Sequence, residues 1–434
     1  MVQADIAAAM HADEIEQERA VARSKPPLVG RMRSGLVLLV ALVICLPVLA
    51  VAWLAWGGDA DASAVSPWAQ MWSTVLPGYI WNTLRLSLSV ALGVLVVGVG
   101  AAWIVTLHDF PLRGFFRWAL LLPLAMPAYV VAFVYTDFLD YAGPVQTGLR
   151  ALFGWTTPAD YWFPQIRSLE GATAVMIACF YPYVYLLTRS ALIEQSQAML
   201  EVGRTLGAGG FAAFRRIALP LAWPSVMVGL TLALMETVSD FGVVDFFAVQ
   251  TLTSGLYNVW LVLGDRAGAA QVAVVLLAMV ALIVFAERHA RAKRAYFALS
   301  TRQAPVRPKR LRGPAAIAAI AACALPLTFG FVLPAGLLLR HAIARASAMA
   351  DPAFLAMVGR SLALGAGAAL LTVGVALGIA YAMRLGVGRL ARSAVRMMTF
   401  GYAVPGPVLA LGVLIPFAAV DRSLNALLGT TLGL

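Results

Sequence analysis

NTLRLSLSVALGVLVVGVGAAW, residues 82–103, decides the fold class of this chain, and Arg85 is its only charged residue. About twenty apolar residues in a helix are enough to cross a hydrocarbon core of roughly 30 Å. The whole chain has this character, because 61% of its 434 residues are hydrophobic and only 12% are charged. Soluble domains carry about 25% charged residues. The sequence therefore predicts an all-α fold, a polytopic membrane helical bundle in contact with the lipid bilayer.

Similar apolar runs recur along the chain and predict nine transmembrane spans. Their predicted bounds are 35–56, 80–106, 116–137, 171–190, 224–247, 269–287, 314–337, 360–383 and 396–418.

Basic residues concentrate in alternate loops between these spans. The loop 57–79 has no Lys or Arg, whereas the segment after the sixth span reads ERHARAKRAYFALSTRQAPVRPKRLRG, residues 287–313. Under the positive-inside rule, this alternation predicts a multi-pass protein of a bacterial inner membrane with a cytoplasmic N-terminus. The net charge of +11 thereby follows from topology, and we expect no nucleic-acid partner.

The chain also contains an internal repeat. Pro127 and Pro405 lie in similar apolar surroundings, and 405 − 127 = 278. Thr83 and Ser361 are again 278 apart, and Pro47 and Pro326 are 279 apart. Because six spans separate the copies, the repeat is parallel. The predicted domains are a cytoplasmic segment 1–34, a first half 35–287 with six spans, a basic cytoplasmic linker 288–313 and an incomplete second half 314–434 with three spans.

The loop 191–223 interrupts the apolar pattern with EVGRTLGAGGFAAFRRIALP, residues 201–220. It reads as two short helices broken at Gly207, with Pro220 and Pro224 closing the loop before the fifth span. Phe211 and Phe214, beside two arginines, would form an apolar ridge suited to a groove on a partner. An interfacial amphipathic helix is the simpler alternative.

The spacing within this loop resembles the ATPase-coupling loop of ABC importer permeases, E-A-A-x3-G-x9-I-x-L-P. Val202 and Gly203 replace the two alanines of that pattern. The resemblance implies the type I ABC importer permease fold and contact with two cytoplasmic ATPase subunits. It assigns the coupling role to Glu201, Gly203, Gly207, Phe211, Phe214, Ile217, Leu219 and Pro220.

ATP hydrolysis is not expected in this chain. Its three lysines follow Ser, Ala and Pro, so no G-x4-G-K-[ST] motif exists. We therefore expect a non-enzymatic subunit that binds no cofactor itself and depends on ATP used by a partner. A periplasmic substrate-binding protein is the further partner that the resemblance implies.

Three stretches resemble ferric-iron importer permeases of the fused two-half form: 108–139, 143–150 and 235–260. Permeases for thiamine, polyamines and aminoethylphosphonate share the architecture and stay open as alternatives. A secondary transporter with 6+6 parallel repeats and a non-functional fragment are rivals of another class.

Iron(III) favours carboxylate and phenolate oxygens, and such groups occur in the spans. Glu236 and Asp240 are four residues apart and are predicted to share a helix face, with Asp245 about one turn further on. Intramembrane ionisable groups usually face a cavity or a partner. The predicted substrate pathway is completed by Asp137, Tyr135 and Tyr181, without a firmly assigned metal site. Hydrogen-bonded packing between helices is the alternative for Glu236 and Asp240, and a place in the bundle or at the membrane interface is the alternative for the tyrosines.

The repeat also sets an expected length. A second coupling loop would begin near 201 + 278 = 479, and the sixth span of the second half would end near 287 + 278 = 565. The expectation is a truncated form of a protein of roughly 550–570 residues, with the glycine-rich 360–383 helix and the 396–418 helix lacking neighbours.

Overall fold

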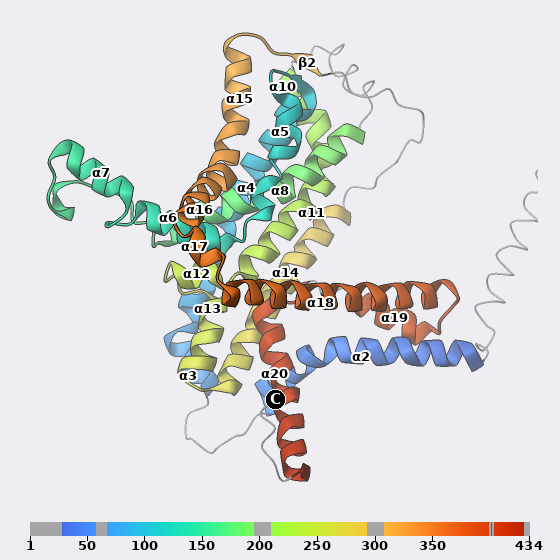
Figure 1. Ribbon diagram of the computed structural model, residues 1–434. Helices are drawn as coiled ribbons and strands as arrows, with labels where there is room; N and C mark the ends of the chain where they lie inside the picture. Colours follow the sequence, from blue (N-terminus) through green and yellow to red (C-terminus); the bar gives the residue numbers. More distant parts are fainter. Residues whose placement is uncertain are drawn as a thin grey trace, which may run out of the picture. The chain divides into compact units, whose positions relative to one another are not determined.

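The computed structural model describes residues 28–57, 67–194, 210–292, 308–398, 401 and 403–428 (Figure 1). They form two compact units. One comprises Met1–Leu46 with Ala350–Tyr402, and the other comprises Pro47–Met349 with Ala403–Leu434. Each unit is described by itself.

The larger unit is almost entirely helical. It contains the second part of α2 (Leu28–Gly57) and a two-stranded parallel sheet of β1 (His108–Asp109) and β2 (Lys309–Arg310). Its helices up to Glu194 are α3 (Pro67–Thr74), α4 (Leu76–Leu107), α5 (Arg113–Ala119), η1 (Leu122–Ala125), α6 (Ala128–Leu139), α7 (Pro144–Phe153), η2 (Pro158–Asp160) and α8 (Leu169–Glu194). Those that follow are α10 (Gly210–Ala213), η3 (Phe214–Ala218), α11 (Leu219–Ser239), α12 (Gly242–Phe246), α13 (Leu252–Tyr257), η4 (Asn258–Val262), α14 (Arg266–Ala292), α15 (Pro314–Leu327), η5 (Thr328–Val332), α16 (Leu333–Ala344), α17 (Ala346–Met349) and α20 (Gly406–Leu428).

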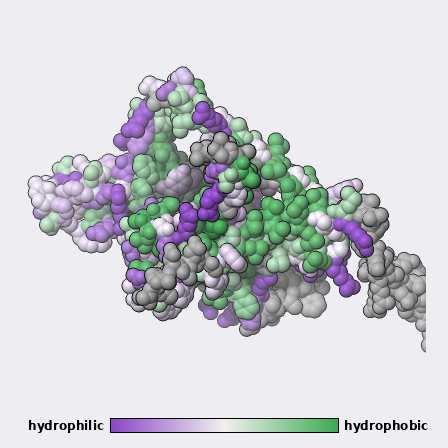
Figure 2. All heavy atoms as spheres, turned by 90° about the horizontal axis from the view of Figure 1, so that it is seen from below, coloured by the Kyte–Doolittle hydropathy of each residue, from purple (hydrophilic) through white to green (hydrophobic). Residues whose placement is uncertain are grey.

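The described residues contain eight helices long and apolar enough to cross a membrane, or nine if one sharply bent pair counts as a span. This confirms the predicted fold class of a polytopic helical membrane protein. In the space-filling view of Figure 2, hydrophobic residues form broad continuous areas of the visible surface, as a lipid-facing surface requires.

Helix α8 is the centre of the larger unit, where α4 and α11 pack against it. A β-carbon added at Gly98 of α4 would lie 2.9 Å from the carbonyl oxygen of Tyr181, and one added at Gly229 of α11 would lie 2.8 Å from that of Tyr183. Both neighbours therefore approach the α8 backbone where only glycine fits. Small residues at helix crossings are the usual means of close packing in a membrane, where lipid tails compete with apolar side chains.

The third predicted span, 116–137, is wrong as a continuous helix. The pair Arg113–Ala125 and Ala128–Phe153 is bent by 89°. Met126, with φ −102° and ψ 118°, is extended and directly precedes Pro127. The ring of a proline disfavours helical geometry at the residue before it, which explains the break.

Two other predicted boundaries are also corrected. The fifth span, 224–247, ends at Ser239, because Asp240 leaves the helical region with φ −70° and ψ 119°. The ninth, 396–418, is two elements: α19 ends at Met398 and α20 begins at Gly406, after Pro405.

The prolines Pro220 and Pro224 do not close the loop before the fifth span. One continuous helix runs from Phe211 to Ser239 through both prolines. Its first part contains the π turn η3, in which the N–H of Leu219 donates to the carbonyl of Phe214. A proline inside a helix removes a donor and crowds the preceding turn. The wider π turn directly before Pro220 is a local adjustment of this kind.

The seventh span packs on α4, α6 and α8. Its π turn η5 brings Gly330 against the carbonyl oxygen of Ala178 in α8, where an added β-carbon would collide. That carbonyl lies four residues before Pro182, which has no N–H to donate to it. A similar close approach joins Gly412 of α20 to the carbonyl of Pro47 in α2. The first span of each predicted half thus contacts the other half. The division into two halves stays a prediction.

The smaller unit consists of the first part of α2 with α18 (Pro352–Arg384) and α19 (Arg389–Met398). Its small core contains Val37, Ala382, Val387 and Ala391. The hydroxyl of Ser34 accepts a 2.9 Å hydrogen bond from the N–H of Gly388 and fixes the turn between α18 and α19.

Helix α18 is exposed along its whole apolar window. Its Gly365, Gly367, Gly374 and Gly378 have no atom within 4 Å of an added β-carbon. The expected lack of neighbours stays a prediction for this helix. It is wrong for α20, whose Val408 and Leu411 are buried in a core with α13 and α14.

Candidate functional site

The predicted coupling loop is described only in its second part. Glu201, Gly203 and Gly207 lie outside the described residues. Phe211, Phe214, Ile217, Leu219 and Pro220 all lie on the continuous helix that becomes α11.

The two phenylalanines of this helix do not form one exposed ridge. Phe214 is buried at 5% exposure, whereas Phe211 is 61% exposed. Both rings meet Trp103, near the C-terminal end of α4: the ring centroids lie 5.3 Å from Phe214 and 5.7 Å from Phe211. Phe214 therefore attaches the helix to α4, and of the two rings Phe211 keeps more surface for a partner.

The same end of α4 also holds the basic linker. His108 pairs with Lys309 and Asp109 with Arg310 in the parallel β1–β2 ladder, and the N–H of Leu311 donates to the carbonyl of Asp109 over 2.8 Å. The His108 ring lies edge-on to Trp103, 5.0 Å between centroids. Burial lowers the pKa of His108, and the nearby Lys309 acts in the same direction.

Arg113 closes the C-terminal end of α4. Its Nε donates to the carbonyl of Val105 over 2.8 Å and its Nη2 to that of Thr106 over 3.3 Å. Basic side chains at this position satisfy carbonyls that have no partner within the helix. Helix α4 thus ends in a fixed cluster that contains the linker and the start of α11.

At the other end of α11, Glu236 and Asp240 do not share a continuous helical face. The helix ends between them, and the N–H of Asp240 donates to the carbonyl of Glu236 over 2.9 Å. A carboxylate oxygen of Asp240 accepts a 2.7 Å hydrogen bond from the N–H of Val243. Asp240 therefore caps α12, as the packing alternative anticipates, and Glu236 lies half-buried one turn earlier.

The remaining predicted acids lie on α12 and α6. Helix α12 packs against α6, and Gly242 lies so close to Tyr129 that an added β-carbon would be 2.6 Å from the Tyr129 Cβ. Asp245 on α12 and Asp137 on α6 are both exposed. Asp137 lies 3.7 Å from His341. Asp240 and Asp245 thus lie just before and within α12, whereas Asp137 lies near the end of α6, two turns beyond Tyr129.

The two predicted pathway tyrosines are buried. Tyr135 is 7% exposed, and its hydroxyl donates a 2.6 Å hydrogen bond to the carbonyl of Phe329 in η5. Tyr181 is fully buried in α8. Both line an apolar groove of about 520 Å³ with Leu325, Pro326 and Phe329. A role in substrate passage stays a prediction for both residues.

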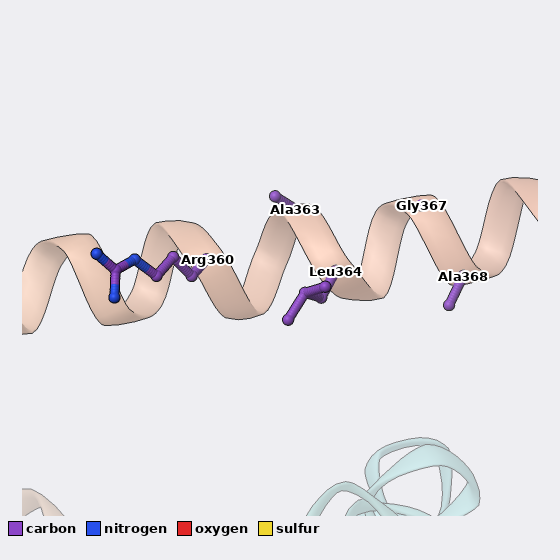
Figure 3. Close-up of a pocket in the computed structure, with 5 residues that line it drawn as sticks. All are labelled: Arg360, Ala363, Leu364, Gly367 and Ala368. Carbon is purple, nitrogen blue, oxygen red and sulfur yellow. The ribbon is translucent and has the colours of Figure 1, made fainter. Parts of the chain in front are cut away.

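Within the described ranges, no group of three or more His, Cys, Asp or Glu side chains could hold a metal ion. In the smaller unit, a concavity of about 640 Å³ is lined by residues of α18 alone (Figure 3). Arg360 is the one charged side chain among those that Figure 3 labels. A surface formed by one side of a single helix has no converging polar groups and is not a candidate site.

Sequence reasoning missed three residues that hold helices of this unit together: Trp103 against Phe214, Thr83 on the N–H of Leu252 and Phe329 on the hydroxyl of Tyr135. A tryptophan at the end of an apolar run was a usable signal for the first. The contacts of Thr83 and Phe329 join segments far apart in the chain, and no local pattern marks them.

Residues 93–294 match the family model described as "Binding-protein-dependent transport system inner membrane component". The matched residues are less than half of the chain. They contain α8, the described part of the coupling loop and α11.

The chain is also similar to permease proteins of several transport systems. The molybdenum transport permease ModB of Escherichia coli (strain K12) is 29% identical over 216 residues, 47% of this chain and 91% of the relative. The probable ABC transporter permease y4fN of Sinorhizobium fredii is 24% identical over 408 residues, 88% of this chain and 70% of the relative. The Fe(3+)-transport permease FbpB 2 of Haemophilus influenzae is 24% identical over 262 residues, 60% of this chain and 46% of the relative.

Proposed function

We propose that this chain is the membrane-spanning permease subunit of an ATP-binding-cassette importer in a bacterial inner membrane. The family match over residues 93–294 and the coupling-loop spacing from Glu201 to Pro220 support this function. The alternation of basic loops supports a cytoplasmic N-terminus, which places the coupling loop and the β1–β2 pair on the cytoplasmic side.

The proposed partners are two cytoplasmic ATPase subunits and a periplasmic binding protein. The ATPases hydrolyse ATP, and their closure moves the helices between inward-open and outward-open arrangements. The exposed ring of Phe211 gives an ATPase an apolar contact near the start of α11. The binding protein delivers the substrate at the opposite end of the spans.

The proposed substrate is ferric iron. The acidic groups at the outer ends of the spans support this proposal. Asp137 and Asp140 lie at the end of α6, and Asp240 and Asp245 lie on the turn and helix that pack against it. Asp140 forms an ion pair with Arg167 over 3.5 Å, so Asp137, Asp240 and Asp245 are the carboxylates proposed to attract a cation and repel oxyanions such as molybdate or a phosphonate. Carboxylate oxygens also suit iron(III), a hard cation.

Uptake of labelled ferric iron tests the substrate in cells that express the chain with its binding protein and ATPase. We expect iron accumulation that requires all three components, and slower accumulation at equal protein abundance when Glu236→Gln and Asp240→Asn are combined. Accumulation of molybdate, thiamine or 2-aminoethylphosphonate instead of iron would show that ferric iron is not the substrate. Uptake that persists without the ATPase would favour the secondary transporter.

A further inference from the structure

Helix α4 is in contact with two functional regions at its opposite ends. It runs without interruption from Leu76 to Leu107. Thr83 and Trp103 are twenty positions apart on it, which corresponds to about 30 Å at 1.5 Å per residue. Its only proline, Pro77, lies in the first turn, where a proline does not disturb the helix.

At the Trp103 end, α4 contacts the start of α11. The indole ring touches both Phe211 and Phe214, and the ring of His108, next to the basic linker, lies edge-on to it. Phe214 is buried in this contact. A displacement of the coupling-loop helix therefore acts directly on α4.

At the Thr83 end, α4 contacts residues 250–255, which lead into α13 and form its first turn. The Thr83 hydroxyl donates to the carbonyl of Tyr79 over 2.6 Å and accepts from the N–H of Leu252 over 2.9 Å. The amide nitrogen of Asn82 donates to the carbonyl of Gln250 over 2.9 Å. Gly255 lies against the ring of Tyr79, where an added β-carbon would be 2.5 Å away.

The contacted segment is itself firmly held. The hydroxyl of Ser254 accepts from the N–H of Thr251 over 2.8 Å, and the hydroxyl of Thr253 donates to the carbonyl of Val238 over 2.6 Å. Because Val238 is in the last turn of α11, residues 250–255 connect the first turns of α4 with the acidic turn at Asp240. The chain has a continuous set of contacts from Phe214 through α4 to that turn.

We propose that Trp103 is a positioning residue that transmits movement of the coupling-loop helix along α4 to residues 250–255. The transmission follows from rigidity: a helix without an internal break moves as one body, and both ends are fixed by buried contacts. The meaning of this movement for transport rests on the proposed function. The mechanical connection between the two ends does not depend on it.

Hydrogen–deuterium exchange of the purified chain tests the connection. Trp103→Ala should accelerate exchange in a peptide covering 249–257, at the far end of α4, by about threefold or more. Trp103→Phe should give a smaller effect, because it keeps an aromatic ring against Phe214. The matched control is Trp118→Ala, since Trp118 is 73% exposed on α5.

The coupling must also work in reverse, because coupling between two sites is reciprocal. Thr83→Val should accelerate exchange in residues 211–218, with unchanged exchange in the α8 peptide 175–188 showing that the fold is intact. An effect of Trp103→Ala confined to residues 100–116 and 211–218 would overturn the proposal. Co-purification of the ATPase is measured separately: its absence in the wild type contradicts the proposed function and leaves the exchange result valid.

Discussion

The Tyr135 hydroxyl and the Phe329 carbonyl oxygen are 2.6 Å apart and join two spans 194 residues apart in the chain. The π turn explains why this carbonyl is available. In η5, the N–H of Leu333 donates to the carbonyl of Thr328, five residues back. The next donor in that pattern would be residue 334, and Pro334 has no N–H. Tyr135 supplies the missing hydrogen bond from the other span.

Tyr135→Phe should therefore lower stability and leave substrate passage unaffected at equal abundance. Removing one partner of a buried hydrogen bond costs about 1–3 kcal/mol, which should be visible as a lower Tm of the purified protein. Tyr129→Phe is the control, because Tyr129 is 57% exposed. Loss of iron uptake with an unchanged Tm would instead support the predicted pathway role.

Gly330→Ala should disturb the packing of the seventh span on α8. The added methyl would collide with the Ala178 carbonyl and lie 2.8 Å from Pro123 Cγ. Overpacking of this kind typically costs about 1–3 kcal/mol. Gly336→Ala, in the same span but with no atom within 4 Å, should be neutral or stabilise the helix slightly. Thermal unfolding of both variants checks the difference, and equal Tm values would contradict the close approach.

Comparing Asp240→Asn with Asp240→Ala distinguishes the helix-capping role of Asp240 from a role of its negative charge in uptake. Asparagine caps helices about as well as aspartate, whereas alanine loses about 1 kcal/mol. We expect both variants to reduce iron uptake and only Asp240→Ala to reduce Tm as well. Full uptake by Asp240→Asn would leave Asp240 with a capping role alone. The measurement needs protein abundance in the membrane alongside the uptake rate.

Glu201→Lys or Gly207→Pro should reduce co-purification of the ATPase while the protein stays in the membrane. The first reverses a charge and the second restricts the backbone where glycine allows freedom. Glu194→Lys, at the exposed end of α8, is the charge-matched control. Wild-type ATPase recovery and transport in both variants would exclude the coupling role of the loop.

Asp160 should keep the turn at residues 156–160 ordered over the whole range from pH 5 to 8. The N–H groups of Thr157 and Thr156 donate to its carboxylate over 2.8 and 2.7 Å, and these bonds lower its pKa. A lowered pKa means that the stabilisation is present above the unfolded value of about 3.9 and is lost only as the pH falls through the folded value. Asp160→Asn should accelerate deuterium exchange in residues 154–162 at every pH in this range, and Gln165→Ala should not. Loosening of the wild-type turn between pH 8 and 5 would contradict the assignment.

The sequence by itself determined the membrane class, the approximate number of spans and the resemblance to ABC importer permeases. These properties are local: a span depends on the apolar character of about twenty consecutive residues, and the coupling-loop pattern lies within residues 201–220. The repeat at 278 residues was also visible, because it compares the chain with itself.

Only the tertiary structure decided which of the predicted site residues act together. Glu236 and Asp240 look like helical neighbours in the sequence, yet the helix ends at Ser239 and the Asp240 carboxylate caps α12. Phe211 and Phe214 look equivalent, yet only Phe214 is buried against Trp103, more than one hundred residues earlier. Such contacts depend on how helices cross, and a crossing is set by side chains from two distant segments at once. Local hydropathy therefore predicts where helices lie, and packing between them decides what each side chain does.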